Sequence, residues 1–235
     1  MDQDIEILQA LHSIAQQGKS VGLITVYKTL PLLFDALIQG FDGGSVHFQV
    51  HRYQWAASRM VWEAFIKSDL LTEPIKANSV VVSPREPVVT LADFEYAKIS
   101  IVRRSLVRVQ PDARIPVILL LNESAQPAEL ADISTGGVSV YVKPEIMDAL
   151  VDANSGPLSG RVEVLIKFPG ENPPLLKLNC AICNVKQETE TGRYRMGLQV
   201  FPDKKTGPLI AQYVANRQTA ILRELEVLAV VDSRE

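Results

Sequence analysis

The apolar residues near the start of the chain recur at intervals of three and four. Within residues 2–17 they are Ile7, Leu8, Leu11, Ile14 and Ala15. This spacing places them on one face of an α-helix and leaves the opposite face polar. We therefore predict an amphipathic helix over residues 2–17.

After this helix the pattern changes to short runs rich in β-branched and aromatic residues, with turn residues between them. Such runs are VGLITVY, SVHFQVHRY and the two halves of NSVVVSPREPVVTL, and Gly43-Gly44 indicates a turn. Residues 54–71, QWAASRMVWEAFIKSDLL, fit the helical and the strand spacing in part, so both structures stay open there. Residues 1–98 thus form a β-rich region that begins with a helix.

Short strands also dominate the second half of the chain. The expected strands are IPVILLLN, PAELADIS, GVSVYVK, GRVEVLIKFP, LLKLNCAICNV and YRMGLQVF. The turn signals between them favour an antiparallel barrel or sandwich. After Gly207-Pro208 the helical spacing returns and predicts a terminal helix over about residues 208–230. No internal repeat is visible in the sequence.

Composition and charge narrow the function classes. The chain has 235 residues, a formal net charge of −3 and a sequence pI of about 5.7. Because DNA- and RNA-binding proteins usually carry a basic face, we expect no nucleic-acid partner. No run approaches the roughly 20 apolar residues of a membrane span, and the acidic start lacks the basic flank of a secretory signal. We expect a cytoplasmic protein.

Two cysteines, Cys180 and Cys183, form a CxxC within the expected strand LLKLNCAICNV. No second CxxC is present, and the three histidines lie far away in the sequence. A structural zinc site needs roughly four such ligands. We therefore expect buried structural thiols here and no metal site.

One short segment contrasts with the acidic background. RRSLVR gathers Arg103, Arg104 and Arg108 just ahead of the second strand-rich half. Guanidinium groups bind phosphate oxygens in a bidentate manner and stack on flat π-systems. Taken alone, the segment is more typical of a solvated linker with ordinary surface charge.

The second conspicuous stretch is DISTGG, with Asp132, Ser134, Gly136 and Gly137 between two expected strands. Asp and Ser close turns through their own backbone, and glycine permits a positive φ, so a plain hairpin turn is one interpretation. The same residues also offer a carboxylate, a hydroxyl and an unshielded main chain. A carboxylate accepts hydrogen bonds from both N1–H and the exocyclic amino group of guanine.

Together the two stretches suit an anionic guanine nucleotide. The sequence has no GxxxxGK[ST] loop and no GxGxxG motif after a strand, which disfavours a nucleoside triphosphate or dinucleotide fold. No carboxylate pair stands beside a histidine or a metal pattern, so we expect a binding protein and not an enzyme, with no cofactor.

The order of these motifs resembles the PilZ domain, the bacterial receptor for cyclic di-GMP, whose signature is RxxxR followed by [D/N]xSxxG on a six-stranded barrel. Arg104 and Arg108 match the first motif, and Asp132, Ser134 and Gly137 match the second. YRMGLQVF is similar to the late strand of such barrels. The terminal YVANRQTAILREL is similar to the closing helix of YcgR-like (flagellar brake) proteins.

The resemblance implies a role for each matched residue. Arg104 and Arg108 would contact the phosphates and guanine faces, Asp132 and Ser134 would read a guanine edge, and Gly137 would leave room for the base. Gly136, next to it, is a further expected ligand-binding residue. Arg103 matches a position where an arginine favours a stacked pair of ligand molecules. One or two cyclic di-GMP per chain therefore both stay open.

The resemblance also implies a mainly β fold of two barrel-like domains, with an N-terminal and a C-terminal helix. The expected divisions are an N-terminal YcgR-like domain (1–98), a hinge and ligand clamp (99–109) and a PilZ barrel with the terminal helix (110–235). We expect the clustered arginines to repel one another until the ligand neutralises them, so that binding changes the inter-domain arrangement.

The implied output is control of motility through a flagellar motor component, with the basal body as an implied place of association. Other proteins of this family act on exopolysaccharide synthesis, pili or virulence, so the downstream partner stays open. So do the role of the N-terminal domain and the choice between monomer and homodimer. The alternative function is a PilZ-type interaction scaffold with weak or no nucleotide binding.

Overall fold

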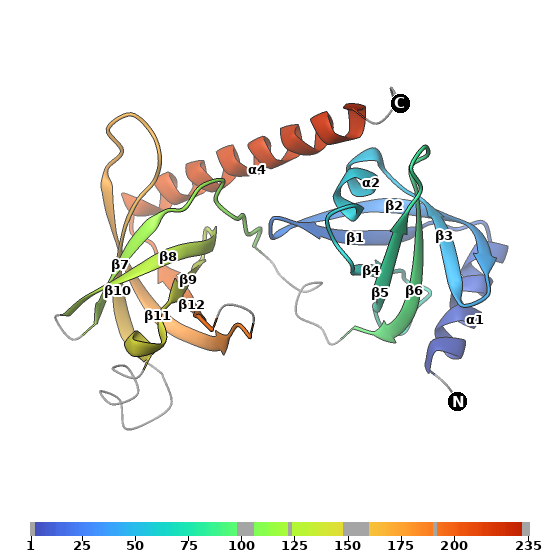
Figure 1. Cartoon of the computed structure of the whole chain (residues 1–235), viewed down its shortest axis with the longest axis horizontal. Coiled ribbons are helices and arrows are strands. Elements are labelled where there is room, and N and C mark those ends of the chain that lie inside the picture. Colours follow the sequence, from blue (N-terminus) through green and yellow to red (C-terminus); the bar gives the residue numbers. More distant parts are fainter. Residues whose placement is uncertain (1–2, 98–105, 122–123, 148–159, 190–191, 232–235) are drawn as a thin grey trace. The chain divides into compact units, whose positions relative to one another are not determined.

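The structure is a computed structural model, and it describes residues 3–97, 106–121, 124–147, 160–189 and 192–231. By their contacts the residues group into two units, Met1–Ser105 with Ala220–Glu235, and Leu106–Thr219. Each unit contains one closed β-barrel, and the strands of both can be followed by colour in Figure 1. The divisions at 1–98, 99–109 and 110–235 stay predictions.

The first barrel has its core between strands and helix α1 (Gln3–Gln16). Within the described residues, six antiparallel strands close this barrel in the order β1-β2-β3-β6-β5-β4. They are β1 Val21–Tyr27, β2 Leu30–Asp42, β3 Ser45–Gln49, β4 Ala64–Lys67, β5 Ile75–Val82 and β6 Val88–Tyr96. Inward-pointing Leu23, Phe48 and Leu91 pack with Ile7 and Leu11 of α1, which confirms the predicted helix.

Residues 54–71, which the sequence left open, contain both kinds of element. Helix α2 covers Arg52–Ser58, and β4 follows at Ala64–Lys67. The imidazole of His51 caps the helix by accepting a hydrogen bond from the amide of Tyr53. Because a short helix and a short strand share one window, neither spacing fits the whole of it.

The second barrel belongs to the unit Leu106–Thr219. Counting only the residues that the structure describes, it has six antiparallel strands in the order β10-β11-β12-β9-β8-β7, and β10 also pairs with β7. They are β7 Pro116–Leu121, β8 Ser124–Ser134, β9 Gly137–Val142, β10 Arg161–Lys167, β11 Leu175–Gln187 and β12 Tyr194–Phe201. Leu119, Val140, Val164 and Leu178 are fully buried inside it.

The two barrels have the same strand order. Started from its first strand, the second barrel runs β7-β8-β9-β12-β11-β10, which matches β1-β2-β3-β6-β5-β4 strand for strand. The sequence shows no corresponding repeat, because different apolar residues fill the two cores. The predicted fold class, two mainly β barrels with a helix at each end, is confirmed.

The terminal helix, α4, covers Thr206–Val231 and so begins slightly before the predicted start. Asp203 precedes it and accepts hydrogen bonds from the amide of Thr206 at 2.7 Å and of Lys205 at 2.8 Å. These bonds, first of all those from Thr206, hold the pKa of Asp203 below its ordinary value. The helix is therefore capped by Asp203, four residues before Gly207, whereas the sequence pattern predicted its start at Gly207-Pro208.

The prediction of buried thiols is correct for Cys180 and wrong for Cys183. Burial raises the pKa of the Cys180 thiol to about 12, whereas Cys183 is exposed. Residues three apart on a strand point to opposite faces, so only one of the two enters the core.

Candidate functional site

The DISTGG stretch forms the β8–β9 hairpin. Ser134 pairs with Gly137, and Thr135 and Gly136 make the turn. Neither glycine has a positive φ, so conformational freedom is not what the turn requires of them. Glycine is needed for space instead: a Cβ on Gly136 would lie 2.6 Å from Cδ1 of Leu106, and one on Gly137 would lie 3.1 Å from the carbonyl oxygen of Leu198.

Asp132 lies on β8 just after a register shift between Leu130 and Asp132, and it faces Ser139 of β9. Its side chain is 2% exposed and forms an ion pair with Arg195 of β12, whose Nη2 donates to Oδ2. A buried carboxylate is stable only when it is paired and hydrogen-bonded. Arg195 therefore neutralises Asp132 while keeping about a third of its own surface open to solvent.

Ser134 is buried beside this pair, and its hydroxyl donates to the carbonyl oxygen of Gly137 at 3.2 Å. The hydrogen bond closes the hairpin, as expected of a serine at this place in a turn. The hydroxyl oxygen keeps its acceptor capacity for a second partner.

The segment that follows the arginine cluster returns to this hairpin. Val109 and Ile133 of β8 form an isolated antiparallel bridge, with both N–H···O bonds made, at 2.9 and 3.0 Å. Both side chains are fully buried, so their neighbours point to the outer face. In this register Arg108 lies opposite Ser134, and Gln110 lies opposite Asp132.

The structure thus brings Arg108, Asp132, Ser134, Gly136 and Gly137 to one place on the second barrel. Leu106 covers Gly136 from the same segment. The two other expected ligand-binding residues, Arg103 and Arg104, lie outside the described part of the chain.

Residues 102–216 match the family model described as "PilZ domain". The match includes the arginine cluster, the hairpin and the first part of α4. An uncharacterized protein from Aquifex aeolicus is 32% identical over 165 residues, which are 69% of this chain and 71% of that protein.

The chain belongs to the PilZ-domain family.

The solved structures to which the chain is similar include complexes with cyclic di-GMP. YcgR from Escherichia coli in complex with c-di-GMP is 9% identical, covers 96% of this chain and 95% of that chain, and has a TM-score of 0.45. The MrkH–c-di-GMP complex of K. pneumonia is 13% identical, with 94% and 96% covered and a TM-score of 0.46. MotI of Bacillus subtilis is 13% identical, with 86% and 97% covered and a TM-score of 0.43.

Arg195 pairs with the expected site residue Asp132, but the sequence motifs did not identify it. It lies two strands away from Asp132 in the barrel order β8-β9-β12, and far from both motifs in the sequence. The strand register reveals it, since Gly197 pairs with Ser139 and thereby sets Arg195 diagonally across from Asp132. A pocket of about 330 Å³ opens beside Arg195, lined also by Lys186, Gln187, Glu188 and Thr189.

The PilZ domain has a second charged group, centred on β8 and separate from the Asp132–Arg195 pair. Glu129 on β8 pairs with Arg193 at 3.3 Å and with Arg114 at 3.8 Å. The guanidinium of Arg193 lies 4.5 Å from the ring centroid of Tyr141. Burial first, and then the nearby Glu188 charge, raise the pKa of Tyr141 above its ordinary value.

No group of three or more His, Cys, Asp or Glu side chains comes together as a metal site in the part of the chain that the structure describes. Among the same residues, no helix is both long and apolar enough to cross a bilayer.

Proposed function

We propose that this chain is a receptor for cyclic di-GMP, a ring with two guanine bases and two phosphates. The observation that supports the proposal most is the bridge between Val109 and Ile133, in whose register Arg108 is opposite Ser134 and Gln110 is opposite Asp132. One small molecule with anionic and guanine groups matches this set of cation, hydroxyl and carboxylate. Membership in the PilZ-domain family supports the same ligand.

Each site residue has a role in the proposed complex. Arg104 and Arg108 bind the phosphates and stack on the bases, with Arg103 as the residue that selects one or two ligand molecules. Asp132 accepts hydrogen bonds from the Watson–Crick edge of a guanine, and Ser134 supplies a further polar contact. Main-chain atoms at Gly136-Gly137 let the ring approach closely.

The Asp132–Arg195 pair adds a step to this scheme. Because the Asp132 carboxylate is buried, a guanine edge reaches it only when Arg195 moves aside or shares it. A carboxylate has acceptor positions on both oxygens, and Arg195 uses Oδ2. The ligand therefore displaces Arg195 from Asp132 or shares the carboxylate with it, and in both cases Arg195 becomes a further cation at the edge of the anionic ring.

The expected affinity is modest. Four or five charge-assisted hydrogen bonds contribute about 1.5–3 kcal/mol each, and the loss of ligand and loop freedom offsets much of this sum. About 8 kcal/mol remains, which corresponds to a Kd near 1 μM.

The proposed output is a change in the arrangement of the two units. The anionic ring neutralises the arginines of residues 103–108 and draws this segment around it. A ligand shifts such an equilibrium only through higher affinity for one arrangement, and a clamp that closes on the ligand provides that difference. A cytoplasmic protein partner would read the new surface, with flagellar motility or another surface-lifestyle trait as the result. The nucleotide is bound and not turned over.

Isothermal titration calorimetry of the full chain tests the proposal. Cyclic di-GMP should bind with micromolar affinity, and GTP at the same concentration should give no comparable heat. The fitted stoichiometry distinguishes one ligand per chain from a stacked pair. Chromatography after long incubation should recover the ligand intact. The absence of binding by cyclic di-GMP would disprove the proposed function.

Small-angle X-ray scattering tests the switch separately. We expect the scattering curve to change when cyclic di-GMP saturates the protein, because the clamp closes on it. Identical curves with and without saturating ligand would leave a receptor that binds but does not rearrange. A pull-down of protein partners in both conditions would then be expected to give equal recovery.

A further inference from the structure

The buried face of α4 contains one charged residue. Within the second unit, Ile210 and Val214 are buried on this face, and Arg217 follows one helical turn later with 5% of its surface exposed. An apolar side chain would cover the barrel without the penalty of burying a charge. An arginine here therefore calls for a reason beyond covering the core.

A hydrogen bond of the Arg217 side chain explains why an arginine is present at this buried position. Nε of Arg217 donates to the carbonyl oxygen of Gln110 at 2.8 Å. Gln110 directly follows Val109, the residue bridged to Ile133, and it lies opposite Asp132. The guanidinium thus holds the main chain of the segment that presents Arg108 to the hairpin.

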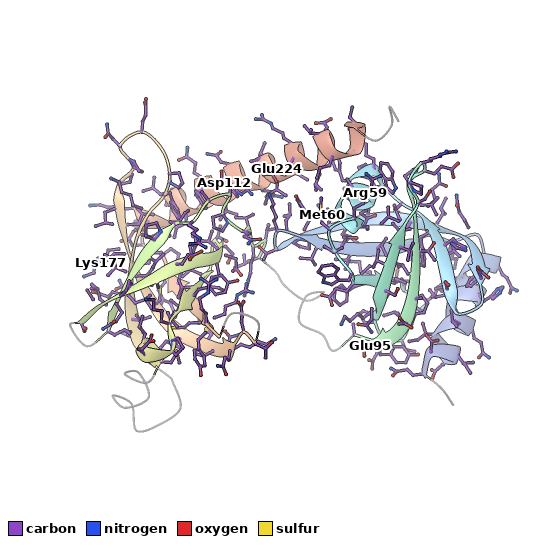
Figure 2. All side chains as sticks on the ribbon, viewed as in Figure 1. Arg59, Met60, Glu95, Asp112, Lys177 and Glu224 are labelled. Atoms are coloured by element: carbon purple, nitrogen blue, oxygen red, sulfur yellow. The ribbon has the colours of Figure 1, made fainter. Side chains whose placement is uncertain are left out.

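The helix is well placed to keep Arg217 fixed. Four residues earlier, the Tyr213 ring stacks on Phe168 with the ring centroids 4.0 Å apart and the planes at 7°. Burial first, and then the charge of Asp112, raise the pKa of the Tyr213 phenol to about 12. Asp112, labelled in Figure 2, belongs to the same chain segment as Gln110 and lies next to this helix. The segment Gln110–Asp112 thus interacts with two side chains of this helix, Arg217 and Tyr213.

We propose that Arg217 is a positioning residue for the nucleotide site: it fixes the Gln110 peptide, and through it the place of Arg108, and so links occupancy of the site to α4. The segment is then held at three points. Leu106 lies over Gly136, and Val109 forms the backbone bridge to Ile133. The carbonyl oxygen of Gln110 accepts the hydrogen bond from Arg217. The effect of Arg217 on ligand binding rests on the proposed function. Its effect on the position of the Gln110 peptide does not. Neither family motif includes Arg217.

A double-mutant cycle with Arg217→Met and Arg108→Ala tests the link. Methionine keeps the apolar stem and removes the donor. We expect Arg217→Met to weaken cyclic di-GMP binding about tenfold, since a charge-assisted hydrogen bond no longer places Arg108. In the Arg108→Ala background the same change should alter binding less than about twofold, because residues that act together are not additive. The exposed Arg223→Met on the same helix is the control and should bind like the parent.

Amide hydrogen exchange gives a readout that needs no ligand. The Val109 amide, which donates to Ile133, should exchange about tenfold faster in Arg217→Met and unchanged in Arg223→Met. Should Arg217→Met fail to fold, Arg217→Lys, which keeps the charge but has no Nε–H, is measured with the same expectation. If the parent protein binds no cyclic di-GMP, the proposed function fails while the exchange result still decides the anchoring. Parent-like exchange in the variant, or a fully additive loss of affinity, would overturn the inference.

Discussion

The β2–β3 hairpin of the first barrel and the β8–β9 hairpin of the second occupy the same position in the same strand order. Both are preceded by a register shift, between Ile38 and Gly40 in one and between Leu130 and Asp132 in the other. Both contain a Gly-Gly pair. The backbone framework of the proposed nucleotide-binding hairpin is therefore present in both barrels.

The side chains differ at each equivalent place. Where the second hairpin has Asp132 and Ser134, the register of the first gives Gly40 and Asp42. Gly43 has a φ of +58°, and a Cβ on Gly43 or Gly44 would meet nothing within 4 Å. At Gly136, by contrast, the preceding segment lies close over the turn.

The comparison shows that the barrel topology alone does not make the site. The second hairpin also has a carboxylate that is ion-paired with a residue two strands away, and a preceding segment that bridges to β8. The first hairpin has α1 beside it instead, where His12 stacks on Phe41 with the ring centroids 4.1 Å apart.

The largest effect is expected from Asp132→Asn. The amide cannot accept both hydrogens of a guanine edge, and it leaves Arg195 without its counter-charge. A loss of about 3 kcal/mol, or roughly a hundredfold in affinity for cyclic di-GMP, should follow in calorimetry. The matched change Asp42→Asn at the exposed first hairpin should leave affinity unchanged. Equal effects of the two variants would contradict the distinction.

Arg108→Ala removes the cation that the bridge holds opposite Ser134. Binding should weaken by about tenfold to a hundredfold, the range for a charge-assisted contact. Arg104→Ala should behave in the same way. The control is Arg114→Ala, whose side chain is 87% exposed and pairs with Glu129, and which should bind normally. Unchanged affinity in both Arg108→Ala and Arg104→Ala would remove the proposed role of the RxxxR motif.

Gly136→Ala tests the covering of the second hairpin. The new Cβ would lie 2.6 Å from Cδ1 of Leu106, so the segment must move away from the turn. We expect a several-fold weaker affinity and a small drop in Tm, about 2–4 °C for each kcal/mol lost in a chain of this size. Gly44→Ala, which meets open space, should change neither quantity. A normal affinity in Gly136→Ala would show that Leu106 does not set the position of the segment.

Ser134→Ala is expected to have the smallest effect. It removes the hydroxyl hydrogen bond to Gly137, which is a neutral contact of 3.2 Å. In the proposed complex the same hydroxyl makes one neutral contact to the ligand, worth about 1 kcal/mol, so affinity should fall by no more than about fivefold. A loss as large as that of Asp132→Asn would mean that Ser134, and not the carboxylate, is the main polar contact.

The sequence predicted the fold class well because the strands have strong β propensity and clear turns, and because α1 and α4 have regular apolar spacing. It did not separate α2 from β4, since the two share one short window. The sequence also did not predict that the two barrels share one strand order, because strand order depends on which strands pair and different residues can form the same pairing. The local motifs gave Arg108, Asp132 and Ser134, whereas Arg195 and Arg217 come from distant strands and helices and appear only once pairing and packing are known.

A crystal structure of the full chain with cyclic di-GMP tests the central claim most directly. The account predicts one ligand ring that contacts Arg108 and Asp132 together at the β8–β9 hairpin, with Arg195 displaced from the carboxylate or sharing it. A nucleotide bound at the β2–β3 hairpin, or one that touches Arg108 while Asp132 stays buried against Arg195 and out of reach, would contradict it.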